Sequence, residues 1–282
     1  METGLTLPNF LVIGAQRAGT SLLHQILAGH PEIYVPTQRK EIHFFDQYFE
    51  RGLDWYQSYF PAPAEAGRYR AIGEVTPDYL ASPEVPAEIR RVLPEVRLVA
   101  ILRNPVDRAY SWYQYARRSR NEQRDFRRFL EEDPTALEAG FYHRNLSRYL
   151  ACFPRTQLHV MIYEDLVRQP AGELDALAAF LDLGQGWQDP AAAVADPVNT
   201  SAIPKYRGAY AAARNVGKLL LRHDLNWPVR VAKQLGIRGL FGRAERAGRL
   251  DEAERSRLAA RYHDDVAALS GLLDRREPVW PI

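Results

Sequence analysis

The sequence predicts an α/β fold in which a mostly parallel sheet is flanked by helices on both faces. Apolar runs short enough to be buried strands recur at 9–14, within 71–80, at 96–102 and at 157–163, with helical patterns between them. Strands that alternate with helices in this way form parallel sheets covered on both sides. The first run also ends at a glycine, turns on a second glycine and leads into a helical pattern. We therefore expect a strand, a phosphate-binding loop and a helix at the start of the chain.

The remaining elements follow from apolar spacing and from helix-stop signals. The first helix has apolar residues at helical spacing across 22–27 and ends at the Gly-His-Pro of 29–31. A short extended piece at 33–35 follows. Pro105 is well placed to open a helix, because the first helical position needs no N–H donor. Further helices are expected at 55–60, 87–93, 125–132, 142–152 and 171–181.

The C-terminal third is expected to be mainly helical from about residue 206. Before it, the stretch 184–205 is rich in Gly, Pro, Asp and Ala, and it is interpreted as a linker without core residues. The stretch 250–273 has the spacing of a long amphipathic helix. A length of 282 residues fits one large domain or two small ones, and we expect a single domain over 1–282.

Composition narrows the class of protein. The formal charge is +2, so no general affinity for polyanions is indicated, and no nucleic-acid partner is expected. Cys152 is the only cysteine, which excludes an intramolecular disulfide and a thiolate metal site. The N-terminus has Glu2 in place of a basic segment, and Pro8 and Gly14 interrupt its apolar run. These features predict a cytoplasmic protein without a membrane span. The oligomeric state stays open.

The loop between Gly14 and Gly19 predicts an anion site of the P-loop type. Backbone N–H groups and the positive end of the next helix make such a loop concave toward an oxyanion. The spacing fits the Walker pattern, but Thr20 and Ser21 stand where a nucleoside-triphosphate site has Lys and then Ser or Thr. Arg17 supplies a cation within the loop. The alternative is an ordinary strand-to-helix turn with an exposed Arg.

The stretch 40–46, Lys-Glu-Ile-His-Phe-Phe-Asp, is a candidate for a catalytic wall. Two carboxylates, a His and a Lys beside two aromatic residues suit a cleft in which a carboxylate acts as a base. A surface helix start with solvated charges and buried phenylalanines would have the same composition. No His or Cys cluster with metal-ligand spacing is visible, and we expect no metal.

Two strand ends and one late loop carry further candidates. Arg103 ends a core strand, and Ser111 lies two turns into the helix that follows, so both can face one anion; Arg103 could equally pair with Asp107. Glu74 and Thr76 also follow a strand, where ligands of α/β sheets usually bind, although a hydrogen-bonded turn would explain them too. The segment 199–208 places the cations of Lys205 and Arg207 around a Tyr, in a ligand-binding or merely solvated loop.

Taken together, these motifs resemble the sulfotransferases that use 3′-phosphoadenosine-5′-phosphosulfate (PAPS). The resemblance is to the branch that contains the heparan sulfate sulfotransferases and their bacterial relatives. Four segments carry it, in the family's order: 16–21, 40–46, 73–80 and 103–113. It implies a P-loop-type fold and PAPS as co-substrate. The donor-binding residues that it implies are Arg17, Ala18, Gly19, Thr20, Ser21, Arg103, Ser111, Lys205 and Arg207.

The resemblance also implies a mechanism. Glu41 would remove a proton from a hydroxyl or amine of a carbohydrate or small-molecule acceptor, and His43 and Asp46 would orient or assist it. Arg17 would stabilise charge on the leaving phosphate; this branch usually has Lys there, whereas Arg resembles the protein-tyrosine sulfotransferases. Val75 stands where heparan sulfate enzymes have Lys, which disfavours a heparan-like acceptor.

Two rival functions stay open at this point. An ATP-dependent small-molecule kinase would need Mg²⁺ and a Lys after Gly19, where the chain has Thr20. A catalytically silent nucleotide-binding protein would bind the donor product without turnover. Loss of Glu41 or Arg103 would have favoured it, and the sequence retains both.

Overall fold

The computed structural model describes residues 6–120, 122–195, 202–203, 245–246 and 250–282. Its centre is a five-stranded parallel sheet in the order β2-β3-β1-β4-β5, with a separate antiparallel pair β6-β7. This confirms the predicted α/β class. The strands are β1 Phe10–Gly14, β2 Ile33–Tyr34, β3 Ala71–Val75, β4 Arg97–Leu102, β5 Leu158–Ile162, β6 Ala202–Ile203 and β7 Glu245–Arg246.

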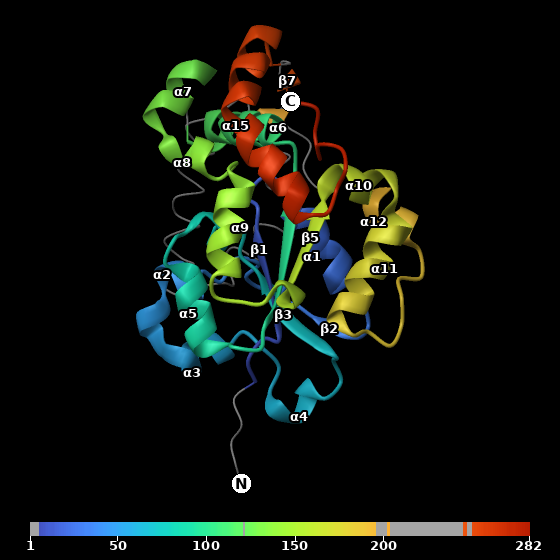
Figure 1. Ribbon diagram of the computed structural model, residues 1–282. Helices are drawn as coiled ribbons and strands as arrows, with labels where there is room; N and C mark the ends of the chain where they lie inside the picture. Colours follow the sequence, from blue (N-terminus) through green and yellow to red (C-terminus); the bar gives the residue numbers. More distant parts are fainter. Residues whose placement is uncertain (1–5, 121, 196–201, 204–244, 247–249) are drawn as a thin grey trace.

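Helices cover both faces of the sheet (Figure 1). On one side lie α1 Thr20–Ala28, α10 Tyr163–Arg168, α11 Pro170–Leu181 and α12 Pro190–Ala195. The other helices are α2 Phe44–Gln47, α3 Gly52–Gln57, α4 Pro63–Ala66, α5 Val85–Val92, α6 Pro105–Ser119, α7 Phe126–Glu132, α8 Pro134–Glu138, α9 Tyr142–Leu150 and α15 Glu252–Leu272. In the described part of the chain, three 3₁₀ turns lie at Phe49–Arg51, Tyr79–Ala81 and Arg155–Gln157. No helix among these described segments is long and apolar enough to cross a membrane.

The central strand shows why the sheet is buried on both faces. Successive side chains of a strand point to opposite sides, so Leu11 and Ile13 of β1 pack in one apolar cluster while Phe10 and Val12 pack in the other. The backbone of Asn9 continues this pairing at the strand's start: its carbonyl accepts from the Arg97 N–H at 2.9 Å. Such a strand needs no polar face, which explains its continuous apolar run.

The C-terminal helix α15 completes the core on the α6 and α9 side (Figure 1). Its buried stripe follows the predicted spacing at Leu258, Tyr262, Val266 and Leu269. The hydroxyl of Tyr262 donates to the Leu137 carbonyl at 2.9 Å. The predicted helical character from about residue 206 falls largely on 204–244, outside the described residues, and stays a prediction there.

The predicted linker at 184–205 was wrong for its first half. Residues 190–195 form α12, and Trp187 is half-buried against the cluster beneath α1 and α11. The Trp187 ring lies 4.8 Å from the ring of His30, and Glu32 accepts backbone N–H bonds from Gly184 and Gln185. The ring of Trp187 and the carboxylate of Glu32 therefore hold residues 184–187 against the rest of the domain, although their composition is typical of a loop.

Candidate active site

The loop between β1 and α1 is built around Gly19. Gly19 has φ +100°, and a Cβ there would lie 2.4 Å from the Tyr163 ring, so both conformation and space require glycine. The N–H of Ala18 donates to the Ala15 carbonyl at 3.1 Å and is used inside the loop. Helix α1 then begins at Thr20, and its first N–H groups have no partner within the helix. The loop therefore presents free amides and a helix N-terminus, as the sequence predicted.

Arg17 lies against the helix that follows β4. Its Nε donates to Ser111 Oγ at 3.2 Å, and its guanidinium lies 5.1 Å from the Tyr115 ring centre. Burial, together with the positive charges of Arg118 and Arg103, lowers the pKa of Arg17 to about 10. The predicted loop cation and the predicted Ser are thus in direct contact, although 94 residues separate them.

Arg103 does not form the ion pair with Asp107 that the sequence left open as an alternative. Asp107 pairs with Arg255 at 2.6 Å, and no carboxylate of the described residues forms an ion pair with Arg103. The Arg103 guanidinium lies 5.4 Å from the centre of the Tyr163 ring, which also packs on Gly19. Its backbone carbonyl accepts from Tyr142 at 2.8 Å. Tyr163 thus connects the loop with the strand end that carries the second cation.

A third cation is the ammonium group of Lys40, which lies against the first residues of α1. The sequence assigned it no role. Its Nζ donates to Thr20 Oγ1 at 3.3 Å, to Ser21 Oγ at 3.2 Å and to Glu41 Oε1 at 3.2 Å. Burial lowers the pKa of Lys40, while Glu41 opposes that shift. Its position next to Glu41 in the sequence was the available signal, but spacing alone does not show that a side chain reaches back to a loop 20 residues earlier.

Glu41, His43 and Asp46 form a chain of charged groups. Asp46 Oδ2 lies 2.9 Å from His43 Nδ1, and Glu41 Oε2 lies 3.9 Å from His43 Nε2. The side chain of Glu41 is 42% exposed, against 16% for His43 and 10% for Asp46. Glu41 is therefore the carboxylate that an external molecule can reach, while Asp46 supports the imidazole from behind. This arrangement favours the catalytic-wall interpretation over a solvated surface.

The pKa values of this group depend on one another. Burial alone would raise the pKa of Glu41, but His43 and Lys40 lower it to about 2. Burial alone would lower the pKa of His43, but the carboxylates of Asp46 and Glu41 raise it to about 10. At neutral pH the pair is therefore a carboxylate beside an imidazolium, and Glu41 has the ionised form that a base requires.

Glu74 and Thr76 prove to be supports beneath this group. Glu74 is fully buried and accepts from Tyr56 at 2.7 Å, from Thr76 at 2.7 Å and from Tyr79 at 3.1 Å. Thr76 Oγ1 in turn accepts from the backbone N–H of Ile42 at 3.2 Å. Burial raises the pKa of Glu74. Of the two alternatives for these residues, the hydrogen-bonded turn is correct, and it anchors the backbone next to Glu41.

Asp78 joins the same group from the turn after β3. Its Oδ1 accepts from Gln16 Nε2 at 2.9 Å, and one ligand atom each of Glu41, His43 and Asp78 lies within 4.8 Å of the others. Burial raises the pKa of Asp78, although His43 opposes the shift. A His and two carboxylates at this separation have the ligand types of a metal site. No metal-ligand spacing is visible in the sequence, because Asp78 follows Glu41 by 37 positions.

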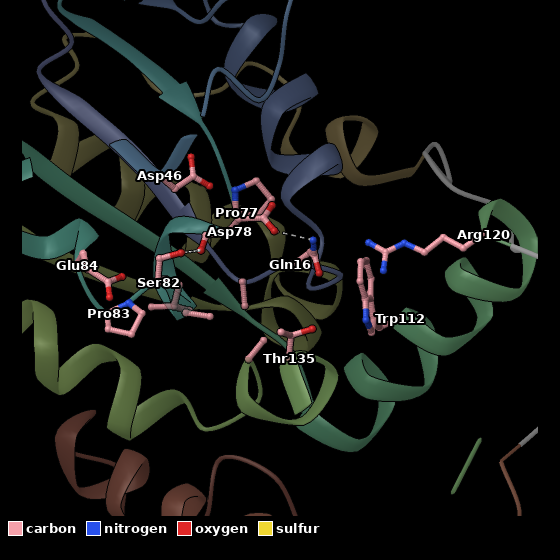
Figure 2. Close-up of a pocket in the computed structure, with 14 residues that line it drawn as sticks. Gln16, Asp46, Pro77, Asp78, Ser82, Pro83, Glu84, Trp112, Arg120 and Thr135 are labelled. Atoms are coloured by element: carbon pink, nitrogen blue, oxygen red, sulfur yellow. Dashed lines mark hydrogen bonds between the residues drawn. The ribbon is translucent and has the colours of Figure 1, made fainter. Parts of the chain in front are cut away.

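A cavity of about 360 Å³ opens beside this group. Figure 2 shows Asp46, Asp78 and Glu84 on one side of it, and Trp112 and Arg120 on the other. Val75 does not line it but packs in the apolar cluster that includes α1. Of the cavity residues, Gln16, Asp46 and Asp78 belong to three of the segments that carry the family resemblance, and the residues contributed by α6 and α8 were not singled out from the sequence. The Pro-Asp pair after β3 was the available signal, since strand ends of α/β sheets carry ligands.

The structure thus brings together most of the predicted donor residues. The loop residues, Arg17 and Ser111 adjoin one another, and Arg103 is linked to them through Tyr163. Lys205 and Arg207 lie outside the described residues, so their part in the site stays a prediction.

Comparison with known proteins identifies the family. Residues 7–213 match the family model described as the sulfotransferase domain. The chain therefore belongs to the sulfotransferase family, and its sheet and loop have the P-loop-type α/β fold of that family, as predicted.

Individual relatives are similar over part of their length. The chain is 32% identical over 196 residues to a bovine bifunctional heparan sulfate N-deacetylase/N-sulfotransferase 2, covering 63% of this chain and 22% of that protein. It is 32% identical over 184 residues to human heparan sulfate glucosamine 3-O-sulfotransferase 6, covering 62% of this chain and 52% of that protein. The chain thus spans between about a fifth and a half of these relatives.

A solved structure supports the fold independently. A sulfotransferase from Alicyclobacillus acidocaldarius superposes with a TM-score of 0.68 at 24% identity, covering 98% of this chain and 99% of that one. This likeness extends over nearly the whole chain and concerns the fold alone.

Proposed function

We propose that this protein is a PAPS-dependent sulfotransferase that acts on a hydroxyl or amine of a carbohydrate or small molecule. The observation that carries the proposal is the grouping of Arg17 and Lys40 at the start of α1, beside the exposed carboxylate of Glu41. A donor with two anionic groups fits a site with two cations at a loop and a third, Arg103, at a strand end. An in-line transfer also needs a base at the border of that site, where Glu41 stands.

The residues divide the chemistry between donor and acceptor. Amides of Gly19, Thr20 and Ser21 are suited to the 5′-phosphosulfate, and Arg103 with Ser111 to the 3′-phosphate. During transfer the bond between sulfur and the bridging phosphate oxygen breaks, and a bond from sulfur to the acceptor oxygen or nitrogen forms. The acceptor's proton passes to Glu41, and the negative charge stays on the leaving phosphate.

Arg17 and Lys40 are the groups that can stabilise that leaving charge. Lys40 Nζ contacts Thr20, Ser21 and Glu41. Its positive charge is therefore close both to the candidate base and to the proposed phosphate position. Two cations at this position supply the electrostatic role that Mg²⁺ has for triphosphates. We therefore expect transfer without an added metal. The single cysteine suits a reducing compartment, and we propose a cytoplasmic location.

The kinase alternative is less well supported. Lys40 reaches Thr20 and Ser21 from outside the loop, so a lysine is present near the phosphate position, but it also contacts the candidate base. ATP lacks a 3′-phosphate, so a kinase would have no use for the additional cation Arg103. A silent binding protein would not need the exposed, ionised Glu41.

Incubation with ³⁵S-labelled PAPS and a panel of sugars, phenols and amines tests this function. We expect label in at least one acceptor and the same rate with excess EDTA. Transfer of ³²P from γ-labelled ATP that requires Mg²⁺ would support the kinase. Binding of adenosine 3′,5′-bisphosphate without transfer to any acceptor would support the silent protein.

A further inference from the structure

We propose that Trp280 is a positioning residue for the donor site, and that it holds Arg103 in the orientation needed to bind a 3′-phosphate. It acts through Glu164 and Tyr142 and not by a contact with the donor. This inference rests on the proposed sulfotransferase function and deepens it, because it extends the 3′-phosphate site to a residue that follows α15 in the sequence.

One peptide group connects the end of β4 with the start of α6. It consists of the Arg103 carbonyl and the Asn104 N–H, and it lies beyond Leu102, the last residue of β4. Tyr142 donates its hydroxyl to the carbonyl at 2.8 Å, and Glu164 Oε1 accepts from the N–H at 3.0 Å. Because a peptide group is planar, these two side chains together fix the direction in which the backbone leaves the sheet.

Trp280 contacts both of the side chains that hold this peptide group. Its indole N–H donates to Glu164 Oε2 at 3.0 Å, so the two oxygens of one carboxylate accept from Trp280 and from Asn104. Its ring centre lies 5.8 Å from that of Tyr142, at an interplanar angle of 50°. Trp280 is 4% exposed and Tyr142 is fully buried, and buried side chains in a close-packed interior have little room to move. Trp280 therefore restrains both side chains.

The segment that carries Trp280 is attached to two helices. The backbone N–H of Val279 donates to Ser270 Oγ at 3.0 Å, and Arg275 pairs with Asp165 at 2.6 Å. Ser270 belongs to α15, and Asp165 lies in α10 next to the carboxylate that Trp280 binds. Contacts with both helices therefore set the position of the indole.

The peptide group matters for the donor because the Arg103 side chain leaves the backbone there. Its guanidinium lies 5.4 Å from the centre of the Tyr163 ring. The start of α6 is also held by its own cap, since Asn104 Oδ1 accepts from the N–H of Val106 at 3.0 Å. A turn of the peptide group is therefore expected to displace Arg103 more than α6. A displacement of about 1 Å is enough to break a hydrogen bond, whose donor–acceptor distance spans only roughly 2.7–3.2 Å.

Trp280→Phe is the informative variant, because it keeps a ring against Tyr142 and removes the N–H donor to Glu164. In calorimetric titrations its affinity for adenosine 3′,5′-bisphosphate should be about three- to tenfold weaker, as expected for a lost hydrogen bond. Its affinity for adenosine 5′-monophosphate, which lacks the 3′-phosphate, should stay within about twofold. Trp187→Phe is the matched control in the other apolar cluster, where the ring packs on His30, and it should change neither affinity.

A double-mutant cycle with Arg103→Ala separates positioning from general support. If Trp280 acts through Arg103, Trp280→Phe should weaken binding of the bisphosphate by less than about twofold once Arg103 is alanine. A merely structural role would weaken it equally in both backgrounds. Glu164→Gln is the second variant and replaces Trp280→Phe if that protein does not fold. It leaves one oxygen acceptor for two donors, so the same selective loss of affinity for the bisphosphate is expected.

The outcomes separate this inference from the function on which it rests. If the variants lose affinity for both nucleotides equally, or if neither changes the preference for the bisphosphate, the positioning role is wrong while the sulfotransferase stands. An undiminished effect of Trp280→Phe in the Arg103→Ala background would also overturn it. If adenosine 3′,5′-bisphosphate does not bind the wild-type protein, the proposed function fails first.

Discussion

The two sides of Glu41 differ in charge. On the loop side, Arg17 and Lys40 surround the start of α1, and the hydroxyls of Thr20 and Ser21 face Lys40. On the cavity side, Asp78 and Asp46 lie beside His43, with carboxylates in excess. Glu41 touches both sides, through Lys40 at 3.2 Å and His43 at 3.9 Å.

This difference explains how one carboxylate can serve between an anionic donor and an acceptor. In the proposed function, cations on the loop side would hold the leaving phosphate, whereas the carboxylates beside His43 raise its pKa and His43 in turn lowers the pKa of Glu41. A uniformly basic cleft would attract anions to both halves. Each half is therefore expected to respond to its own set of substitutions.

The largest expected effect comes from the group between the two halves. Glu41→Gln keeps the size of the side chain and removes the base, so turnover should fall by at least about 100-fold, the low end for general-base catalysis. Affinity for adenosine 3′,5′-bisphosphate should stay nearly unchanged, as measured by calorimetry. Asp46→Asn is the matched control and should lose less, with His43→Ala between them. Near wild-type turnover in Glu41→Gln would assign the base to another group.

Arg103→Ala should distinguish binding of the 3′-phosphate from binding of the 5′-phosphate. Loss of a charged hydrogen bond costs about 1.5–3 kcal/mol, so affinity for adenosine 3′,5′-bisphosphate should fall by about 10- to 150-fold. Adenosine 5′-monophosphate lacks the 3′-phosphate and should bind the variant and the wild type alike. An equal loss for both nucleotides would mean that Arg103 supports the loop in general and does not read the 3′-phosphate.

Lys40→Met should have a smaller effect on donor binding, because Arg17 remains at the loop. We expect affinity for adenosine 3′,5′-bisphosphate to weaken by about tenfold, equivalent to about 1.4 kcal/mol. The acid limb of the activity profile should also move to higher pH, because Lys40 helps to keep the pKa of Glu41 low. Unchanged donor affinity together with an unchanged acid limb would leave Lys40 without a role on either side.

A separate effect concerns stability instead of activity or affinity, and it reports on the cavity side. The pKa of His43 is raised from 6.5 to about 10, so its charge stabilises the native state fully below pH 6.5 and ceases to do so as pH rises through about 10. The difference in unfolding free energy between wild type and His43→Asn should therefore be constant below pH 6.5 and shrink between pH 6.5 and 10. Urea titrations across this range measure it, and a difference that grows with pH would contradict the assignment.

The sequence was most informative where chemistry lies within a short segment. The loop residues and the run from Glu41 to Asp46 could be predicted, because strand, turn and helix signals place them locally. The contact of Arg17 with Ser111 could not be predicted, since it joins residues 94 positions apart; the sequence paired Ser111 with Arg103 as a shared anion site. The segment 73–80 with Asp78 could be singled out by resemblance, but the cavity that Asp78 shares with Trp112 could not be predicted, because it depends on how the turn after β3 lies beside α6. The parallel sheet could also be predicted from local signals, because its buried strands are continuous apolar runs.

In the proposed function, the cationic side of Glu41 binds a nucleotide with phosphates at both the 5′ and the 3′ position. Calorimetric titration of the wild-type protein with adenosine 3′,5′-bisphosphate and with adenosine 5′-monophosphate tests it most directly. We expect the bisphosphate to bind at least about tenfold more tightly, equivalent to about 1.4 kcal/mol, in buffer with EDTA. Equal affinity for the two nucleotides would contradict it.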